Sequence, residues 1–179
     1  LFLAPGLLLF AVFRVYPLLE GLQLSFTNAR LGRATSQFVG LANYAALLTD
    51  VRFGEAVWHT LVYTALAVIL PLVLGTIAAL IFHEHFPLRG FLRSVFILPM
   101  MATPVAIALV WTMMFHPQQG VLNYLLSLVG IPPLLWVYSP TLVIPSLVLV
   151  EIWHWTPLVM LIVLGGLASL PTEPYESAR

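Results

Sequence analysis

Cysteine is missing from the 179 residues of this sequence. Disulfide bonds, metal sites built on thiolates and cysteine nucleophiles are therefore excluded within it. Lysine is missing as well, because all seven basic residues are arginines. The phosphate-binding loop of P-loop ATPases requires a lysine, so this stretch cannot be an ATP-hydrolysing subunit of that type. If the protein works with ATP, a partner must hydrolyse it.

Charged residues of either sign are also scarce. They make up 8% of the sequence, whereas an ordinary soluble domain has about 25%. Hydrophobic residues make up 61%, the mean hydropathy is +1.02, and the formal net charge is zero. This composition indicates a protein in contact with membrane lipid. It offers neither a basic face for nucleic acid nor a polybasic tail.

Four apolar stretches are long enough to be membrane-spanning helices: residues 1–24, 57–82, 94–115 and 141–170. The second has 26 residues without a charged side chain, which give about 39 Å of helix for a hydrocarbon core of about 30 Å. In the first, we expect Pro17 to mark the outer end of the span. The sequence therefore predicts an all-α fold, a polytopic transmembrane helix bundle within one domain. Because it starts at Leu1 rather than Met, we expect it to be part of a longer protein.

Polar segments connect these stretches. In the first of them, residues 25–56, the run Phe38–Tyr44 predicts a turn and a short helix capped near Asn43, which anchors the loop on the membrane face. The second connection is residues 83–93. Here His83 and His85 lie two residues apart and on different faces of a helix, so the pair predicts no metal site.

The third connection, residues 116–140, is apolar enough to be mistaken for a span. Gly130, Pro132 and Pro133 divide it into two parts that are each too short to cross a membrane. We therefore expect a half-helix and a loop, with Trp136 and Tyr138 at the membrane interface.

Gly75 and Ala79 lie four residues apart in the second apolar stretch. Small residues at this spacing allow two membrane helices to approach closely. We therefore expect a helix-packing contact at this pair.

Glu151 and His154 are polar side chains within an apolar stretch, three residues apart and on one helix face. A carboxylate at this depth is costly unless it is paired, protonated or facing water. Three hypotheses remain open: a di-iron site, which needs a second Glu-x-x-His pair and further glutamates; hydrogen bonding between helices; and a polar position on a translocation path. Trp111, Trp153 and Trp155 would offer flat faces to sugar rings if they point inward.

Several motifs resemble one family. Residues 93–111, R-S-V-F-I-L-P-M-M-A-T-P-V-A-I-A-L-V-W, and 115–123, F-H-P-Q-Q-G-V-L-N, are similar to sugar-type permeases of binding-protein-dependent ABC transporters, and so is F-V-G-L-A-N-Y at 38–44. The last residues, L-A-S-L-P-T-E-P-Y-E-S-A-R, resemble the approach to the Glu-Ala-Ala loop of these inner-membrane components. Glu176, Ser177 and Ala178 stand where that motif begins.

The resemblance implies a transmembrane pathway subunit of an ATP-driven importer for carbohydrates, in a bacterial or archaeal plasma membrane. It implies three protein partners: a second permease subunit, an ATP-binding cassette ATPase dimer that binds ATP and magnesium, and an external solute-binding protein. The chain itself is expected to hold no cofactor and to be no enzyme. The ATPase-coupling loop would begin in residues 171–179, with Tyr175, Glu176, Ser177 and Ala178, and the candidate translocation-path residues are Trp111, Glu151, Trp153 and His154.

Orientation follows from the resemblance rather than from charge, because three arginines fall on each side of the predicted spans. The family places the segment that contains Glu176 in the cytoplasm, so 83–93 is cytoplasmic and 25–56 and 116–140 are external. Two other functions stay open: an ion-coupled secondary transporter with Glu151 and His154 as a proton relay, and a structural membrane subunit. An intramembrane enzyme is disfavoured, since neither a G-x-S nor an H-E-x-x-H pattern is present.

Overall fold

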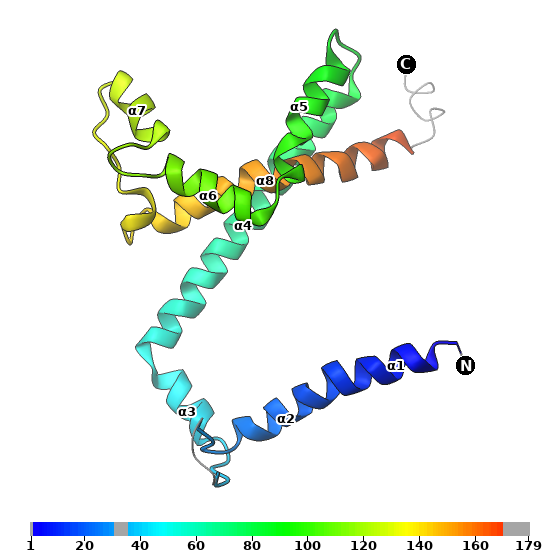
Figure 1. Cartoon of the computed structure of the whole chain (residues 1–179), viewed down its shortest axis with the longest axis vertical. Coiled ribbons are helices and arrows are strands. Elements are labelled where there is room, and N and C mark those ends of the chain that lie inside the picture. The colour runs from blue at the N-terminus through cyan, green and yellow to red at the C-terminus, as the bar shows by residue number, and fades with distance from the viewer. Residues whose placement is uncertain (1, 31–35, 170–179) are drawn as a thin grey trace, which may run out of the picture. The chain divides into compact units, whose positions relative to one another are not determined.

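The structure is a computed structural model that describes residues 2–30 and 36–169 (Figure 1). Every named element in these ranges is a helix, and an isolated antiparallel bridge joins Thr27 to Phe38. The predicted all-α fold is confirmed. The chain divides into two compact units, residues 1–58 and 59–179.

The first unit begins with a nearly continuous helix. It consists of α1 (Ala4–Phe10), a π-helical turn (Ala11–Val15) and α2 (Tyr16–Ser25). The helix continues eight residues past Pro17 to Ser25, so Pro17 does not end it, and the place of Pro17 at the outer end of the span stays a prediction. Proline has no backbone N–H to donate. The π turn before it has a wider hydrogen-bond spacing, which allows the helix to continue without that donor.

Asn43 does not cap its own helix. The short helix α3 (Ala42–Thr49) has Leu41 at its N-cap position, with no side-chain cap. The Asn43 amide instead donates to the backbone oxygens of Ser25 and Thr27, at 2.7 and 2.8 Å. Ser25 is the last residue of α2 and Thr27 lies two residues beyond it, so Asn43 provides hydrogen-bond donors for the end of the preceding helix and ties the loop to it.

The next helix, α4 (Val51–His83), starts six residues before the predicted span. Asp50 explains the early start, because its Oδ1 accepts a hydrogen bond from the backbone N–H of Arg52 at 2.8 Å. This is the contact of an N-cap residue. At the other end, the connection to α5 is only residues 84–88, since α5 begins at Arg89.

The third apolar stretch is bent. Helix α5 (Arg89–Met101) and helix α6 (Pro104–Met114) meet at 96° across a two-residue break. Ala102 and Thr103 are extended there, with ψ angles of 142° and 146°. The residue before a proline avoids the helical region, so Pro104 favours this break and begins a new helix. Among the described residues, three helices are long and apolar enough to cross a membrane, or four if the bent pair is one span.

The predicted half-helix is present as α7 (Val121–Leu128), followed by an extended segment and a 3-10 turn, Trp136–Tyr138. The last described helix, α8 (Val143–Ala168), packs against both arms of the bend. We call the two groups of buried residues the α5 cluster (Ala79, Phe82, Met160 and Leu164, with Phe96 and Ile97) and the α6 cluster (Ile107, Trp111 and Phe115, with Trp136 and Val150).

Gly75 lets α4 and α8 approach closely, as its spacing with Ala79 predicted. A Cβ atom placed on Gly75 would lie 2.6 Å from the Cβ of Val159 and 2.9 Å from the backbone oxygen of Thr156. Ala79 is completely buried one turn further along. Two helix backbones can come this close only where the facing side chain is hydrogen or methyl.

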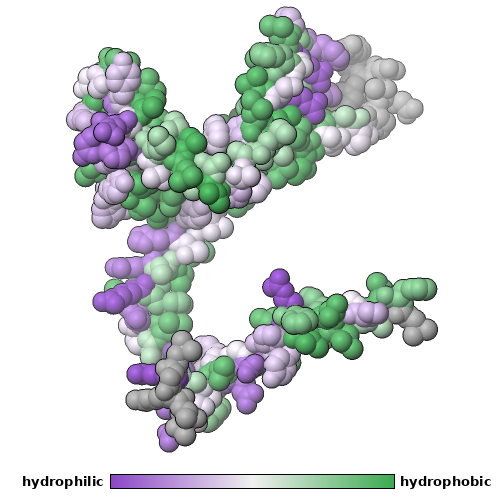
Figure 2. All heavy atoms as spheres, in the orientation of Figure 1, coloured by the Kyte–Doolittle hydropathy of each residue, from purple (hydrophilic) through white to green (hydrophobic). Residues whose placement is uncertain are grey.

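Hydrophobic residues cover much of the visible surface of the long helices (Figure 2). Leu9, Ile69 and Val105 are each more than half exposed within this chain. Apolar surface on this scale is stable only against lipid or other membrane-embedded chains.

Candidate functional site

Three of the four candidate path residues line one cavity. This cavity, of about 420 Å³, lies between α6 and α8, and Trp111, Glu151 and His154 are in its wall. Trp153 lines a different and more apolar cavity of about 520 Å³, formed with α4 and α5. The rings of Trp111 and Trp153 nevertheless meet edge to face, with centroids 5.6 Å apart. The four residues are therefore neighbours, but they face two spaces.

Glu151 is hydrogen bonded to a helix far away in sequence. The Tyr63 hydroxyl on α4 donates to Glu151 Oε1 at 2.8 Å. A carboxyl group at this depth was expected to be paired, protonated or facing water, and the structure gives it this hydrogen-bond partner. Glu151 also lines a third cavity of about 390 Å³ together with Tyr63, so its carboxyl group stands between two spaces. Sequence analysis missed Tyr63, because no motif or spacing links it to a residue 88 positions away.

His154 contacts helix α5. Its Nδ1 lies 3.1 Å from the backbone oxygen of Pro99 in α5. A carbonyl oxygen can only accept, so Nδ1 carries the proton and donates. Glu151 and His154 on α8 thus form hydrogen bonds to two different helices, α4 and α5. This is the interhelical hydrogen bonding that the sequence analysis offered as one hypothesis. In the described part of the chain, no group of three or more metal-ligating side chains gathers around them, and the di-iron hypothesis has no support there.

Trp111 is packed rather than open. Its side chain is buried, and its ring also lies against Phe115, with centroids 5.2 Å apart. Its indole N–H is buried without a partner in the structure. Trp153 and Trp155, which are both more than 40% exposed, have more accessible ring faces. Of the aromatic residues near the path, these two are better placed to stack on a ligand.

A fixed loop closes one end of the α6 cluster. Asn123 on α7 is almost completely buried, and its amide makes four hydrogen bonds of 2.9 to 3.0 Å. Their partners are the Pro117 oxygen, both backbone groups of Leu134, and the indole N–H of Trp136. Trp136 in turn packs on Phe115, with ring centroids 5.6 Å apart.

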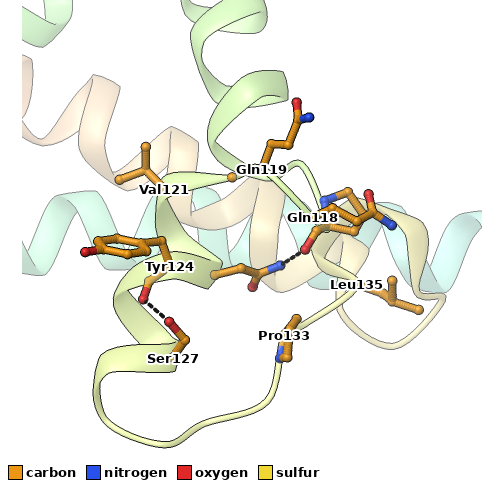
Figure 3. Close-up of a pocket in the computed structure, with 10 residues that line it drawn as sticks. Gln118, Gln119, Val121, Tyr124, Ser127, Pro133 and Leu135 are labelled. Atoms are coloured by element: carbon orange, nitrogen blue, oxygen red, sulfur yellow. Dashed lines mark hydrogen bonds between the residues drawn. The ribbon is translucent and has the colours of Figure 1, made fainter.

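The same loop lines an open cavity of about 760 Å³ (Figure 3). Gln118, Gln119, Tyr124 and Ser127 give it polar walls, and Asn123 and Pro117, which are joined by a hydrogen bond, also line it. Gly120 is required here, because a Cβ atom would lie 2.4 Å from the backbone oxygens of Met114 and His116. The G-x-x-N motif at 120–123 thus has a structural cause in close backbone approach and a saturated amide.

The predicted coupling residues Tyr175, Glu176, Ser177 and Ala178 lie outside the described residues. The last described residue is Ser169, which follows the end of α8. Five residues of the sequence, 170–174, separate Ser169 from Tyr175.

Comparison with known proteins decides the family. The family described as the binding-protein-dependent transport system inner membrane component matches residues 71–179. The chain belongs to this family. The matched range contains α5 to α8, and with them the candidate path residues, the bend and the Asn123 loop. The resemblance found in the motifs is confirmed.

Two curated relatives and one solved structure show how far the likeness extends. The chain is 34% identical over 184 residues to the inner membrane ABC transporter permease protein YcjO of Escherichia coli (strain K12), covering all of this chain and 62% of the relative. It is 29% identical over 178 residues to the trehalose/maltose transport system permease protein MalF of Thermococcus litoralis, covering 99% of this chain and 60% of that protein.

The solved structure is a bacterial alginate ABC transporter in complex with an alginate pentasaccharide-bound periplasmic protein. The TM-score is 0.83 at 24% identity, covering 99% of this chain and 59% of that chain. This likeness shows a shared fold. The chain thus spans about 60% of the length of these relatives.

Proposed function

We propose that this chain is the transmembrane pathway part of an ATP-driven, binding-protein-dependent importer for carbohydrates. The observation that carries the proposal is the family match over residues 71–179. The carbohydrate class is supported by relatives named for trehalose/maltose and alginate transport, each aligned over 99% of this chain. The polar groups on α8 and the exposed tryptophan faces beside them suit a ligand rich in hydroxyl groups and flat sugar rings.

The proposal includes the partners that such a subunit needs. They are a second permease subunit, an ATP-binding cassette ATPase dimer that binds ATP and magnesium, and an external solute-binding protein. The alginate transporter was solved with a periplasmic protein, which supports the last of these. The expected location is a bacterial or archaeal plasma membrane, with residues 84–88 and 171–179 in the cytoplasm. The family description, an inner membrane component, supports this location.

Glu151 is the residue that we place on the path. Its carboxyl group stands between two cavities, and one oxygen is held by Tyr63. A carboxylate accepts hydrogen bonds from hydroxyl groups, so Glu151 suits a sugar that passes along α8. Trp155 lines both of these cavities, Trp153 lines the neighbouring apolar cavity, and the two residues contribute their exposed rings. Trp111 supports this wall from behind by packing against Trp153.

Coupling to ATP is proposed to enter through the end of α8. The segment with Glu176 follows that helix directly and resembles the start of the ATPase-docking loop. Closure of the ATPase dimer would move this segment, and α8 would carry the movement to the cavities that it lines. The bundle would then alternate between access from the two sides of the membrane.

Replacement of Glu151 by Gln tests the proposed function. In the full-length permease, assembled with its partners in proteoliposomes, uptake of a radiolabelled oligosaccharide should remain dependent on ATP. The substrate concentration for half-maximal uptake should rise about ten-fold, as expected for the loss of one charge-assisted hydrogen bond. Glu55→Gln, on an exposed part of α4, is the matched control and should change neither value.

The secondary-transport hypothesis predicts the opposite outcome. Uptake would be driven by a proton gradient without ATP, and Glu151→Gln would abolish that coupling. The structure gives a relay little support, because the hydrogen-bond partners described for Glu151 and His154 are Tyr63 and Pro99 rather than each other. Proton-driven uptake without ATP would overturn the proposed function.

A further inference from the structure

His154 lies at the place where the α5–α6 bend meets α8. On one side of it along α8, Met160 and Leu164 pack in the α5 cluster. On the other side, Val150 packs in the α6 cluster. His154 therefore sits between the two hydrophobic contacts that hold the two arms of the bend on one helix.

The Pro99 carbonyl needs a partner because of the bend. In an uninterrupted helix its oxygen would accept the backbone N–H of residue 103. Helix α5 ends at Met101, and the backbone contact that remains is from Ala102, at 3.3 Å. The shorter contact comes from His154 Nδ1, at 3.1 Å. A side chain of α8 thus supplies a second hydrogen bond to this oxygen in place of the one that the break removes, in a region where no water is available to supply it.

We propose that His154 is a positioning residue that fixes the α5–α6 bend to α8, so that a movement of α8 changes the bend. Its transport consequence rests on the proposed function, whereas its structural consequence does not. The hydrogen bond lies between two cavities, because His154 lines the one beside α6 and Pro99 lines the one beside α5. A change at this contact alters both cavities together.

The chemistry of the contact selects which replacement can keep it. The donor is Nδ1, the ring nitrogen nearer the backbone. An Asn side chain places its amide nitrogen near that position, whereas the amide of Gln is one carbon further out. Asn at position 154 should therefore retain the hydrogen bond to Pro99, and Gln and Ala should lose it.

Spin-label distances across the bend test the inference directly. The sequence contains no cysteine, so Phe91→Cys on α5 and Met113→Cys on α6, both exposed positions, give one label on each arm. The full-length permease with its partners, in lipid nanodiscs, is measured with and without ATP. In the protein that retains His154 and in H154N, the distance between the two labels should have one narrow distribution, which should shift when ATP binds. In H154A and H154Q, the distribution should broaden and lose its dependence on ATP.

Uptake by the same proteins gives the second measurement. H154N should retain more uptake than H154A and H154Q, which should lose about two- to thirty-fold, the range for a broken coupling contact. His59→Ala, an exposed histidine on α4, is the matched control. A ring ¹⁵N signal from His154 that shows a bare Nδ1 would overturn the assignment of the donor.

The failures of the two proposals can be told apart. If the label distances are unchanged in all three His154 variants while uptake remains ATP-dependent, the positioning role is wrong and the proposed function stands. If the bend depends on His154 but uptake does not depend on ATP, the positioning role stands and the proposed function is wrong. Equal loss in H154N and H154A, with loss of the assembled complex, would show that His154 serves only folding.

Discussion

Asn123 uses its whole amide, with two donor and two acceptor contacts, inside a stretch of otherwise apolar chain. Each such bond contributes about 0.5–1.5 kcal/mol net, and leaving a buried partner unsatisfied costs about 1–3 kcal/mol. The side chain therefore stabilises the α7 loop far more than its size suggests. It also sets the position of Trp136, and through Trp136 the end of the α6 cluster.

Replacement of Asn123 by Ala is predicted to destabilise this part of the chain by about 2–4 kcal/mol, because four partly buried groups lose their hydrogen bonds. The measurement is the thermal unfolding midpoint of the purified protein in detergent, which should fall by several degrees. Trp136 fluorescence should shift as its indole N–H loses its acceptor. Ser127→Ala, which removes an exposed hydroxyl on the same helix, is the control and should leave both values unchanged. Equal midpoints for the two variants would contradict this role.

The sequence was sufficient to select Glu151 and His154, because polar side chains within apolar stretches are rare and conspicuous. It did not reveal their partners. Tyr63 is an aromatic residue in an apolar helix, and the Pro99 oxygen is a backbone atom that no pattern marks. Such contacts arise only when helices that are distant in sequence are packed together. The path role of the four candidate residues remains a prediction.

At the scale of the element, proline had two different outcomes. Pro104 favours an extended residue before it and so breaks the third stretch, where the sequence analysis predicted one span and no 96° bend. Pro17, which was expected at the outer end of a span, lies within a helix that continues past it. The difference lies in the backbone. A π turn before Pro17 allows the helix to continue without the N–H that proline lacks, whereas residues 102 and 103 form no such turn. Composition cannot distinguish these cases.

The contact between α4 and α8 gives a prediction for a whole element. Gly75→Ala should destabilise the contact by about 1–3 kcal/mol, since its new Cβ would overlap Val159 and the backbone of Thr156. Gly54→Ala, also on α4 but with open space around it, should be neutral or slightly stabilising. Disulfide formation between cysteines introduced at Ala79 and Met160 reports the helix approach. Equally fast cross-linking in both glycine variants would show that Gly75 is not needed.

At the scale of the whole molecule, the described chain exposes long apolar helices and buries few side chains completely. Hydropathy predicted these exposed apolar helices correctly, because their presence depends on composition more than on individual contacts. The division of residues 121–138 into a half-helix and a loop was also foreseen, from three turn-forming residues. The side of the membrane on which each connection lies remains a prediction, since the arginines are evenly divided.

The coupling segment gives the prediction for the assembled transporter. Glu176→Ala should leave the complex assembled and should lower uptake about ten-fold or more while ATP hydrolysis continues, because movement of the ATPase no longer reaches α8. Glu173→Ala, three residues earlier and outside the motif, is the matched control. Uptake and hydrolysis are measured on the same proteoliposomes. Parallel loss of both in the two variants would mean that the segment has no specific coupling role.

The Asn123 contacts also bear on how the protein is made. All the partners of this residue lie within 13 positions of it in the sequence. Contacts between near neighbours close quickly, without waiting for distant chain. The loop around α7 can therefore form while α8 is still inside the ribosome. An apolar run with nearly the length of a span is then already held as a short helix and a loop when α8 follows it.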